Sequence, residues 1–199
     1  AARPAGAPQL LRVIPRYVST RMALDADAPI QSVFQQLAAD EARTLAIADE
    51  IAKSFTKGRK VLVLTERTEH LQLLHSALEA GVDTLFTLHG RLSRKQRATV
   101  IAELEALDAE APRVLLATGK LVGEGFDHPP LDTLVLAMPI SWKGKLQQYA
   151  GRLHREQAGK DSVTIIDFVD TGHPALLRMW ERRQRGYRAM DYRIVATQE

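Results

Sequence analysis

Short apolar runs alternate with amphipathic segments along most of this chain, and this alternation constrains the fold more than any other feature. The predicted strands are 61–64, 84–88, 114–117, 134–137, 163–169 and 192–195. The predicted helices are 68–80, 93–107, a segment after residue 141 and 174–190. Wholly apolar strands are typical of parallel sheets that are covered on both faces. The sequence therefore predicts an α/β protein, with a mostly parallel central sheet and helices on both faces.

The first part of the chain departs from this pattern, and we expect residues 1–57 to form an N-terminal helical extension. Residues 1–28 are rich in Ala and Pro around one β-like run, which predicts an irregular or edge segment. Helical spacing then continues from Ile30 to Phe55, and a break near Asp40 indicates two helices or one kinked helix. The main predicted domain spans 58–199.

Composition limits the classes of partner. The chain is 45% hydrophobic and 26% charged, which is ordinary for a globular protein. It has no cysteine, so disulfides and thiolate metal sites are excluded, and the histidines lack paired ligand spacing, so no metal site is predicted. No apolar run approaches the roughly 18 residues of a membrane span, and we expect a cytoplasmic protein without a membrane partner. A net charge of +3 permits a phosphate-rich partner without requiring one.

A glycine-rich loop joins two of the predicted strands. It runs from Gly119 to Pro130 and contains Gly123, Gly125 and Asp127. We expect the Asp127 carboxylate at the carboxyl end of a strand, the edge where open α/β sheets bind ligands. The glycines allow close backbone approach, although a turn alone would also explain them.

The segment 148–155, with the sequence QYAGRLHR after Gln147, places two arginines behind a glycine. On a helix, Gln148, Gly151, Arg152 and Arg155 would share one face. Gly151 costs such a helix roughly 1 kcal/mol relative to alanine, which a closely approaching phosphate or backbone would explain. Taken alone, the arginine pair is equally typical of a solvated helix face.

In order along the chain, these segments resemble conserved motifs of superfamily 2 helicases and translocases. The pattern T-x6-G-x-D-x-P from Thr118 resembles motif V, and Q-x-x-G-R-x-x-R from Gln148 resembles motif VI. Residues 60–67 resemble motif IV, and Leu88-His89-Gly90 resembles the segment after it. The strings at 64–71 and 124–134 are closer to the restriction and repair branch, which includes type III restriction subunits, than to DEAD-box proteins. The resemblance implies a RecA-like three-layer sandwich.

A nucleotide-driven motor also needs a G-x-x-x-x-G-K-[ST] phosphate loop, and the chain contains none. The string Asp40-Glu41-Ala42-Arg43 mimics a Mg²⁺-binding carboxylate box, but it lies in a helical pattern and predicts a solvated helix face. The resemblance therefore implies the second RecA-like domain of a motor, with residues 1–57 leading towards a first domain that is absent here. That first domain would hold most of the contacts to ATP with Mg²⁺.

The resemblance also implies roles around the nucleotide. Arg155 would be an arginine finger and Arg152 its partner on the phosphates, while a surface salt bridge is the alternative. Gln148 would order the segment near ATP, or be an ordinary polar residue. Asp127 and Gly125 would lie at the nucleotide, with Asp127 touching the ribose or motif VI; an Asp that caps its own loop is the alternative.

Other residues are candidates for contacts with nucleic acid. Thr65, Thr118 and Gly119 close predicted strands, where hydroxyls and backbone amides suit phosphate contacts, and Lys120 adds charge. His89 and Gly90 follow another strand end. Strand-end capping and local hydrogen bonds explain these positions equally well. The basic stretch 178–188 is better explained as the solvated back of a helix.

The expected function is the C-terminal half of an ATP-dependent nucleic-acid motor, with double-stranded DNA favoured and the isolated chain inactive. One alternative is a catalytically silent RecA-like module that binds nucleic acid or protein. A self-contained α/β nucleotide enzyme is least expected, because no phosphate loop follows the first strand of the alternation.

Overall fold

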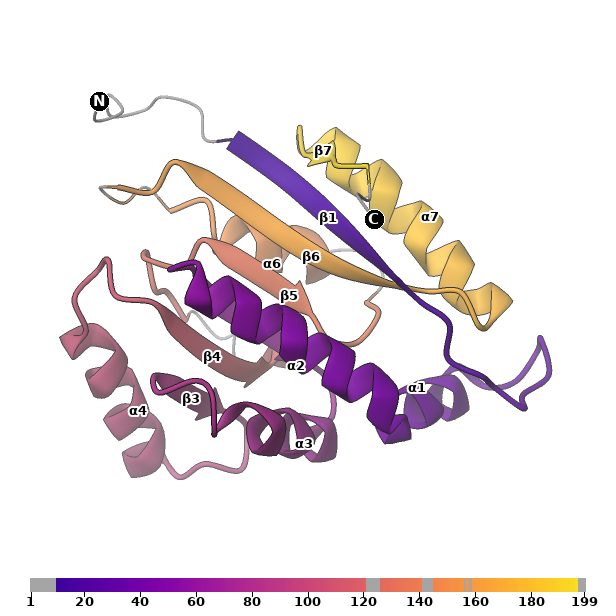
Figure 1. The fold of residues 1–199 in the computed structure, drawn as a ribbon, viewed down its shortest axis with the longest axis horizontal. Helices are drawn as coiled ribbons and strands as arrows, with labels where there is room; N and C mark the ends of the chain where they lie inside the picture. The colour runs from indigo at the N-terminus through magenta and orange to yellow at the C-terminus, as the bar shows by residue number, and fades with distance from the viewer. Residues whose placement is uncertain (1–9, 121–125, 141–144, 156, 158, 197–199) are drawn as a thin grey trace.

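The computed structural model describes residues 10–120, 126–140, 145–155, 157 and 159–196. In these ranges, seven strands form one parallel sheet in the order β3-β4-β2-β5-β6-β1-β7 (Figure 1). The strands are β1 Leu10–Val18, β2 Lys60–Thr65, β3 Leu85–Leu88, β4 Arg113–Thr118, β5 Thr133–Leu136, β6 Ser162–Asp170 and β7 Arg193–Ile194. The helices are α1 Ile30–Ala39, α2 Glu41–Thr56, α3 Thr68–Leu78, α4 Arg94–Ala106, α6 Gln147–Gly151 and α7 Pro174–Ala189.

Helices cover both faces of the sheet, because successive strand residues point to opposite sides. In β2, Val61 and Val63 join the core beneath α2 and α3. Leu62 and Leu64 join the opposite core, which contains residues of α4, α6 and α7. Figure 1 shows α2 and α3 on the near side of the sheet and α6 behind it. The predicted three-layer α/β sandwich is confirmed.

The N-terminal strand differs from the prediction. All nine residues of β1 pair with β6, from Leu10 opposite Ser162 to Val18 opposite Asp170, and β7 pairs with the other side of β1. The expectation of an irregular segment is therefore wrong for these residues, whereas the expected edge position is close to the observed one, because among the described strands only the two-residue β7 lies outside β1. Pro15 is tolerated because β7 pairs only with residues 12 and 13, so no described neighbour on that side needs its missing N–H. The sheet thus runs across residue 57, and the proposed domain boundary there stays a prediction.

The helical break near Asp40 is a capped start of a second helix. The Asp40 side chain accepts a hydrogen bond from the Arg43 backbone N–H at 2.7 Å and so caps α2. The prediction of a solvated face is wrong for Arg43, whose exposure is 1%. Its guanidinium instead reaches β6, because Asp170 lies beneath α2.

Two buried arginine–aspartate pairs attach helices on opposite faces to β6. Arg43 of α2 binds Asp170 with two hydrogen bonds, of 2.8 and 3.1 Å. Arg183 of α7 binds Asp167 with two more, of 2.8 and 2.9 Å, and the Tyr187 hydroxyl also donates to Asp167 at 2.7 Å. Each planar guanidinium group donates two parallel hydrogen bonds to its carboxylate, so the two groups match in shape as well as in charge. Strand β6 therefore fixes one helix on each face.

We predict that Arg43→Met lowers the free energy of unfolding by about 3–5 kcal/mol, because it leaves the Asp170 carboxylate buried without its partner. The double variant Arg43→Met/Asp170→Leu should recover most of this loss. Urea unfolding measures both changes. The matched control is Arg16→Met, which breaks the partly exposed Arg16–Glu50 pair and should cost at most about 1 kcal/mol. Equal losses for Arg16→Met and Arg43→Met would contradict the prediction.

Candidate functional site

The residues predicted to contact nucleic acid lie together at the carboxyl edge of the sheet. Strands β3, β4 and β2 are neighbours, and Thr65 and Thr118 are aligned at the ends of β2 and β4. Leu88 at the end of β3 aligns with Ala117 of β4. The six predicted residues at these strand ends are Thr65, His89, Gly90, Thr118, Gly119 and Lys120. They therefore form one continuous edge.

Several of these residues already have local partners. The Thr65 hydroxyl is buried and lies 3.0 Å from Nδ1 of His70. The Arg91 backbone N–H donates to Nδ1 of His89 at 3.2 Å. Local capping thus describes the side chains of Thr65 and His89 in this structure. Gly90 and Lys120 are exposed, so their surfaces are available to a ligand.

Close packing against side chains of the same chain explains the glycine at position 119. A Cβ at this position would collide with the Tyr149 hydroxyl and lie 2.7 Å from Oε1 of Glu66. Burial, followed by the nearby Glu66 carboxylate, raises the pKa of Tyr149 to about 12, so its hydroxyl stays protonated. Tyr149 thus joins α6 to the end of β4. The sequence analysis did not identify Tyr149 and Glu66 as neighbours of Gly119. The only sign of a close contact there was a glycine directly after a strand.

The glycine loop predicted Asp127 at the carboxyl end of a strand, and this prediction is wrong. Asp127 precedes His128, whose Nε2 lies 3.0 Å from Nη1 of Arg113, the first residue of β4. Asp127 therefore lies towards the amino ends of the strands. The reason is the parallel sheet, in which the chain must cross back before it begins β5. Gly125 and Gly123 fall outside the described residues.

The structure brings Asp127 and Arg155 together. Nη2 of Arg155 lies 3.4 Å from Oδ2 of Asp127, and the two side chains are 59% and 39% exposed. An exposed pair of this kind adds only about 0–1 kcal/mol to stability. Its atoms remain accessible from outside, so the guanidinium is open to an incoming anion.

Helix α6 is shorter than the sequence indicates. It ends at Gly151, and the backbone N–H groups of Leu153 and His154 donate to carbonyls three residues back, at 3.0 and 3.2 Å. These tighter turns end the helix, so the predicted single helical face is wrong for Arg155, which lies beyond it. The end is held by buried Leu153 and by the His154 ring, whose Nε2 lies 2.6 Å from the Tyr192 hydroxyl.

The other residues of this segment leave room and hydrogen-bonding capacity for a ligand. Gln148 and Gly151 are exposed, and no described atom would lie within 4 Å of a Cβ on Gly151. Within the part of the chain that the structure describes, no close backbone explains that glycine. Nε of Arg152 is buried and has no hydrogen-bond partner among the described residues. A buried donor without a partner is unfavourable, and an anion would satisfy it.

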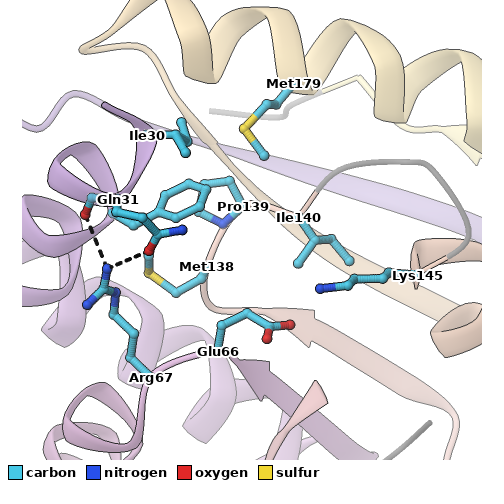
Figure 2. Close-up of a pocket in the computed structure, with 10 residues that line it drawn as sticks. Ile30, Gln31, Glu66, Arg67, Met138, Pro139, Ile140, Lys145 and Met179 are labelled. Carbon is cyan, nitrogen blue, oxygen red and sulfur yellow. Dashed lines mark hydrogen bonds between the residues drawn. The ribbon is translucent and has the colours of Figure 1, made fainter. Parts of the chain in front are cut away.

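A cavity of about 470 Å³ opens beside the carboxyl edge, between α1, α7 and the ends of β2 and β5. Its lining combines the apolar side chains of Met138 and Met179 with the charged side chains of Glu66 and Lys145 (Figure 2). Nη2 of Arg67 donates to the backbone and side-chain oxygens of Gln31, both at 3.1 Å, which closes one wall. Of the predicted site residues that the structure describes, none lines this cavity.

A metal site and a membrane-spanning helix each place requirements on the chain. Within the described part of the chain, no three His, Asp or Glu side chains converge in a way that could hold a metal ion. Among the same residues, no helix is both long and apolar enough to cross a membrane.

The parallel sheet with helices on both faces and the order of the motifs along it agree with a second RecA-like domain, as the sequence resemblance implied. The chain belongs to the family of the helicase conserved C-terminal domain, whose sequence model matches residues 43–157, more than half of its length. That match begins within α2, before the main domain predicted from the sequence.

The chain is also similar to individual proteins. It is 36% identical to uncharacterized protein 108L of Invertebrate iridescent virus 3 over 94 residues, which cover 47% of this chain and 84% of that protein. It is 27% identical to the probable helicase D10 of Escherichia phage T5 over 138 residues, or 69% of this chain and 30% of that protein. The chain thus spans less than a third of the length of the phage relative.

Solved structures share the fold at low sequence identity. The structure of T4 UvsW superposes with a TM-score of 0.73 at 16% identity, covering 94% of this chain and 41% of UvsW. Dbp5 of S. cerevisiae, bound to RNA and ADP BeF3, gives 0.63 at 15% identity, with 94% and 41% coverage. Both comparisons support the fold of this chain.

Two buried histidines predict how stability depends on pH. Burial, reinforced by neighbouring arginines, lowers the pKa of His70 and of His128 to about 4. Both folded values lie below the unfolded value of about 6.5, so the unfolded chain binds more protons between these limits. Stability should therefore be fully present above pH 6.5 and fall as the pH drops towards 4.

Urea unfolding at several pH values between 7.5 and 4 measures this dependence. His128→Gln should reduce the loss of stability on acidification, because it removes one of the two groups. The matched control is His75→Gln, since the His75 side chain is 41% exposed. An unchanged pH profile in His128→Gln would show that His128 is not one of the groups responsible.

Proposed function

We propose that this chain is the C-terminal half of an ATP-dependent nucleic-acid helicase or translocase and completes an ATPase site on a first RecA-like domain. The observation that carries the proposal is the accessible pairing of Arg155 with Asp127. Among the described residues, the buried Nε of Arg152 has no hydrogen-bond partner and the surface over Gly151 is open, and both observations support the proposal. Together they offer positive charge and free space where the resemblance places ATP.

In this proposal, Arg155 is the arginine finger. Phosphoryl transfer spreads negative charge over the γ-phosphate oxygens, and a guanidinium delivered there contributes about 10³–10⁵ in rate. Asp127 holds Arg155 until the two domains close, and the γ-phosphate then replaces the exposed carboxylate as its partner. Arg152 completes the phosphate contacts, with Gln148 in the same segment, and the resemblance gives Gly125 a nucleotide-binding role as well. Because the guanidinium arrives only on closure, hydrolysis is coupled to domain motion.

ATP with Mg²⁺ is held mainly by the first domain in this scheme, since that domain would carry the phosphate loop and the carboxylates for the ion. The described residues of this chain fit that division, because they offer an accessible guanidinium group at the site. We place the complete protein in the cytoplasm, where ATP and nucleic acid are both available.

We also propose that the carboxyl edge of β3, β4 and β2 contacts the phosphate backbone, with double-stranded DNA as the favoured substrate. Lys120 and Gly90 are exposed there, and Thr118 and Gly119 contribute the end of the central strand of the three. Thr65 and His89 have local partners, so their backbones are better placed to contribute than their side chains. Contacts of this kind position a strand without reading its sequence.

In a protein that joins this chain to its phosphate-loop domain, Arg155→Ala should lower kcat for ATP hydrolysis by about 10³-fold or more. The dissociation constant for ATP should change little, because the first domain supplies most of the binding. Steady-state hydrolysis and equilibrium binding of a fluorescent ATP analogue measure the two effects. The control is Arg193→Ala, at an exposed position of β7.

Unchanged hydrolysis in Arg155→Ala would rule out the arginine finger and favour the alternative of a catalytically silent binding module. The isolated chain should hydrolyse no ATP with DNA or RNA present. Turnover by the isolated chain would contradict the shared site.

For the nucleic-acid edge, Lys120→Ala should weaken binding to duplexes of different sequence to a similar extent. It should also reduce the slope of log K against log salt by about one, because one phosphate contact is lost. Fluorescence anisotropy over a range of salt concentrations measures this slope. Lys57→Ala, at the exposed end of α2, is the control. An unchanged slope in Lys120→Ala would place the interface elsewhere.

A further inference from the structure

Arg155 lies outside regular secondary structure, so other contacts must fix its position. Helix α6 ends at Gly151 and β6 begins at Ser162. A side chain attached to an irregular segment has no helical hydrogen bonds to hold its backbone. In this structure, the Arg155 carbonyl instead accepts a hydrogen bond from Nζ of Lys160, at 2.8 Å.

The same ammonium group binds the segment that carries Asp127. Nζ of Lys160 also donates to the carbonyl of Pro129, two residues after Asp127, at 3.0 Å. Lys160 itself is 8% exposed. One buried group therefore ties together the two backbone segments whose side chains form the Arg155–Asp127 pair.

We propose that Lys160 is a positioning residue that fixes the backbone of Arg155 against the Asp127 segment and so sets where the guanidinium points. This inference rests on the proposed function of Arg155. Lys160 acts through its neighbour, because its ammonium group is bonded to main-chain carbonyls at a buried position.

The chemistry of the site explains why a lysine stands there. An ammonium group has three donors and can bind carbonyls that approach from different segments. Burying it is costly, and burial lowers the pKa of Lys160 to about 8, against the opposing effect of Asp132 and Asp127. An apolar side chain of similar length would avoid that cost but could not join the two segments. A buried lysine at this position is therefore better explained by the two backbone segments that it joins than by apolar packing.

A second contact holds the residue on the other side of Arg155. Nε2 of His154 lies 2.6 Å from the Tyr192 hydroxyl, and the two rings stack with centroids 5.7 Å apart. Leu153, one residue further back, is fully buried. The irregular segment is thus fixed at His154 and again at the Arg155 carbonyl, while the Arg155 side chain stays 59% exposed.

Small displacements at such a site have large effects on rate. A shift of about 1 Å caused by a substitution away from the reacting atoms can cost on the order of 10² in rate. Loss of the Lys160 bridge should therefore lower kcat while leaving the binding of ATP nearly intact. A residue needed only for folding would not produce that division.

The first test uses the protein that joins this chain to its phosphate-loop domain. Lys160→Met, which keeps the length of the side chain but loses its donors, should lower kcat on the order of 10²-fold. KM for ATP should stay within about threefold, because the lost interaction acts in the transition state. Lys160→Arg, which keeps the donors, should recover most of the activity, and Lys57→Met is the control on an exposed lysine.

The second test needs no ATPase activity. In the 199-residue chain, ¹⁵N relaxation reports how ordered the backbone amides of His154 and Arg155 are. Lys160→Met should lower the order parameter of Arg155, and Lys160→Arg should restore it. Urea unfolding shows whether each variant is folded. If Lys160→Met does not fold, Lys160→Gln, which keeps one donor group, takes its place.

The two tests separate the possible failures. An unchanged Arg155 order parameter in the Lys160 variant would overturn the positioning role, whatever the activity. A raised KM with unchanged kcat would overturn it too, because it would indicate direct contact between Lys160 and ATP. If Arg155→Ala leaves hydrolysis unchanged, the proposed function fails, and the relaxation measurement still decides whether Lys160 fixes the segment.

Discussion

The parallel direction of the strands determines where each part of the site lies. Because parallel neighbours cannot be joined by a tight hairpin, the chain must return across a face of the sheet after each strand. The ends of β3, β4 and β2 therefore collect at one edge, which carries Thr118 and Lys120. The return from β4 delivers Asp127 to the other side, where it meets Arg155. One topological rule thus separates the proposed nucleic-acid contacts from the proposed nucleotide contacts.

Strand β6 gives this arrangement its rigidity. It lies between β5 and β1, and its two buried carboxylates bind Arg43 of α2 and Arg183 of α7 on opposite faces. Charges buried this deeply are costly unless their hydrogen bonds are well formed, and both pairs are bidentate. The helices are consequently attached to the sheet by directional bonds in addition to apolar packing.

The sequence predicts the parts of the fold that depend on local patterns. Apolar runs such as 61–64 and 114–117 mark buried parallel strands, and the motif order indicates the family. Contacts between distant residues were not predictable. The nine residues of β1 are interrupted by Pro15 and two arginines, and the pairing of β1 with β6 joins positions about 150 residues apart. Helical spacing in 148–155 suggested a continuous helix. In the structure the helix ends earlier, and His154 contacts Tyr192, which is 38 residues away in the sequence. Arg43 looked like a surface charge because its partner Asp170 lies 127 residues away in the sequence.

The contact between Tyr149 and Gly119 has a mechanical consequence. Tyr149 belongs to the short helix that leads into Arg152, and its hydroxyl rests against the backbone just after β4. The phenol ring is rigid and buried, so it acts as a strut between the two regions. Any rotation of that helix must either push the end of β4 or open a void beside it. Movement of that helix towards β4 is in this way opposed by the backbone at Gly119.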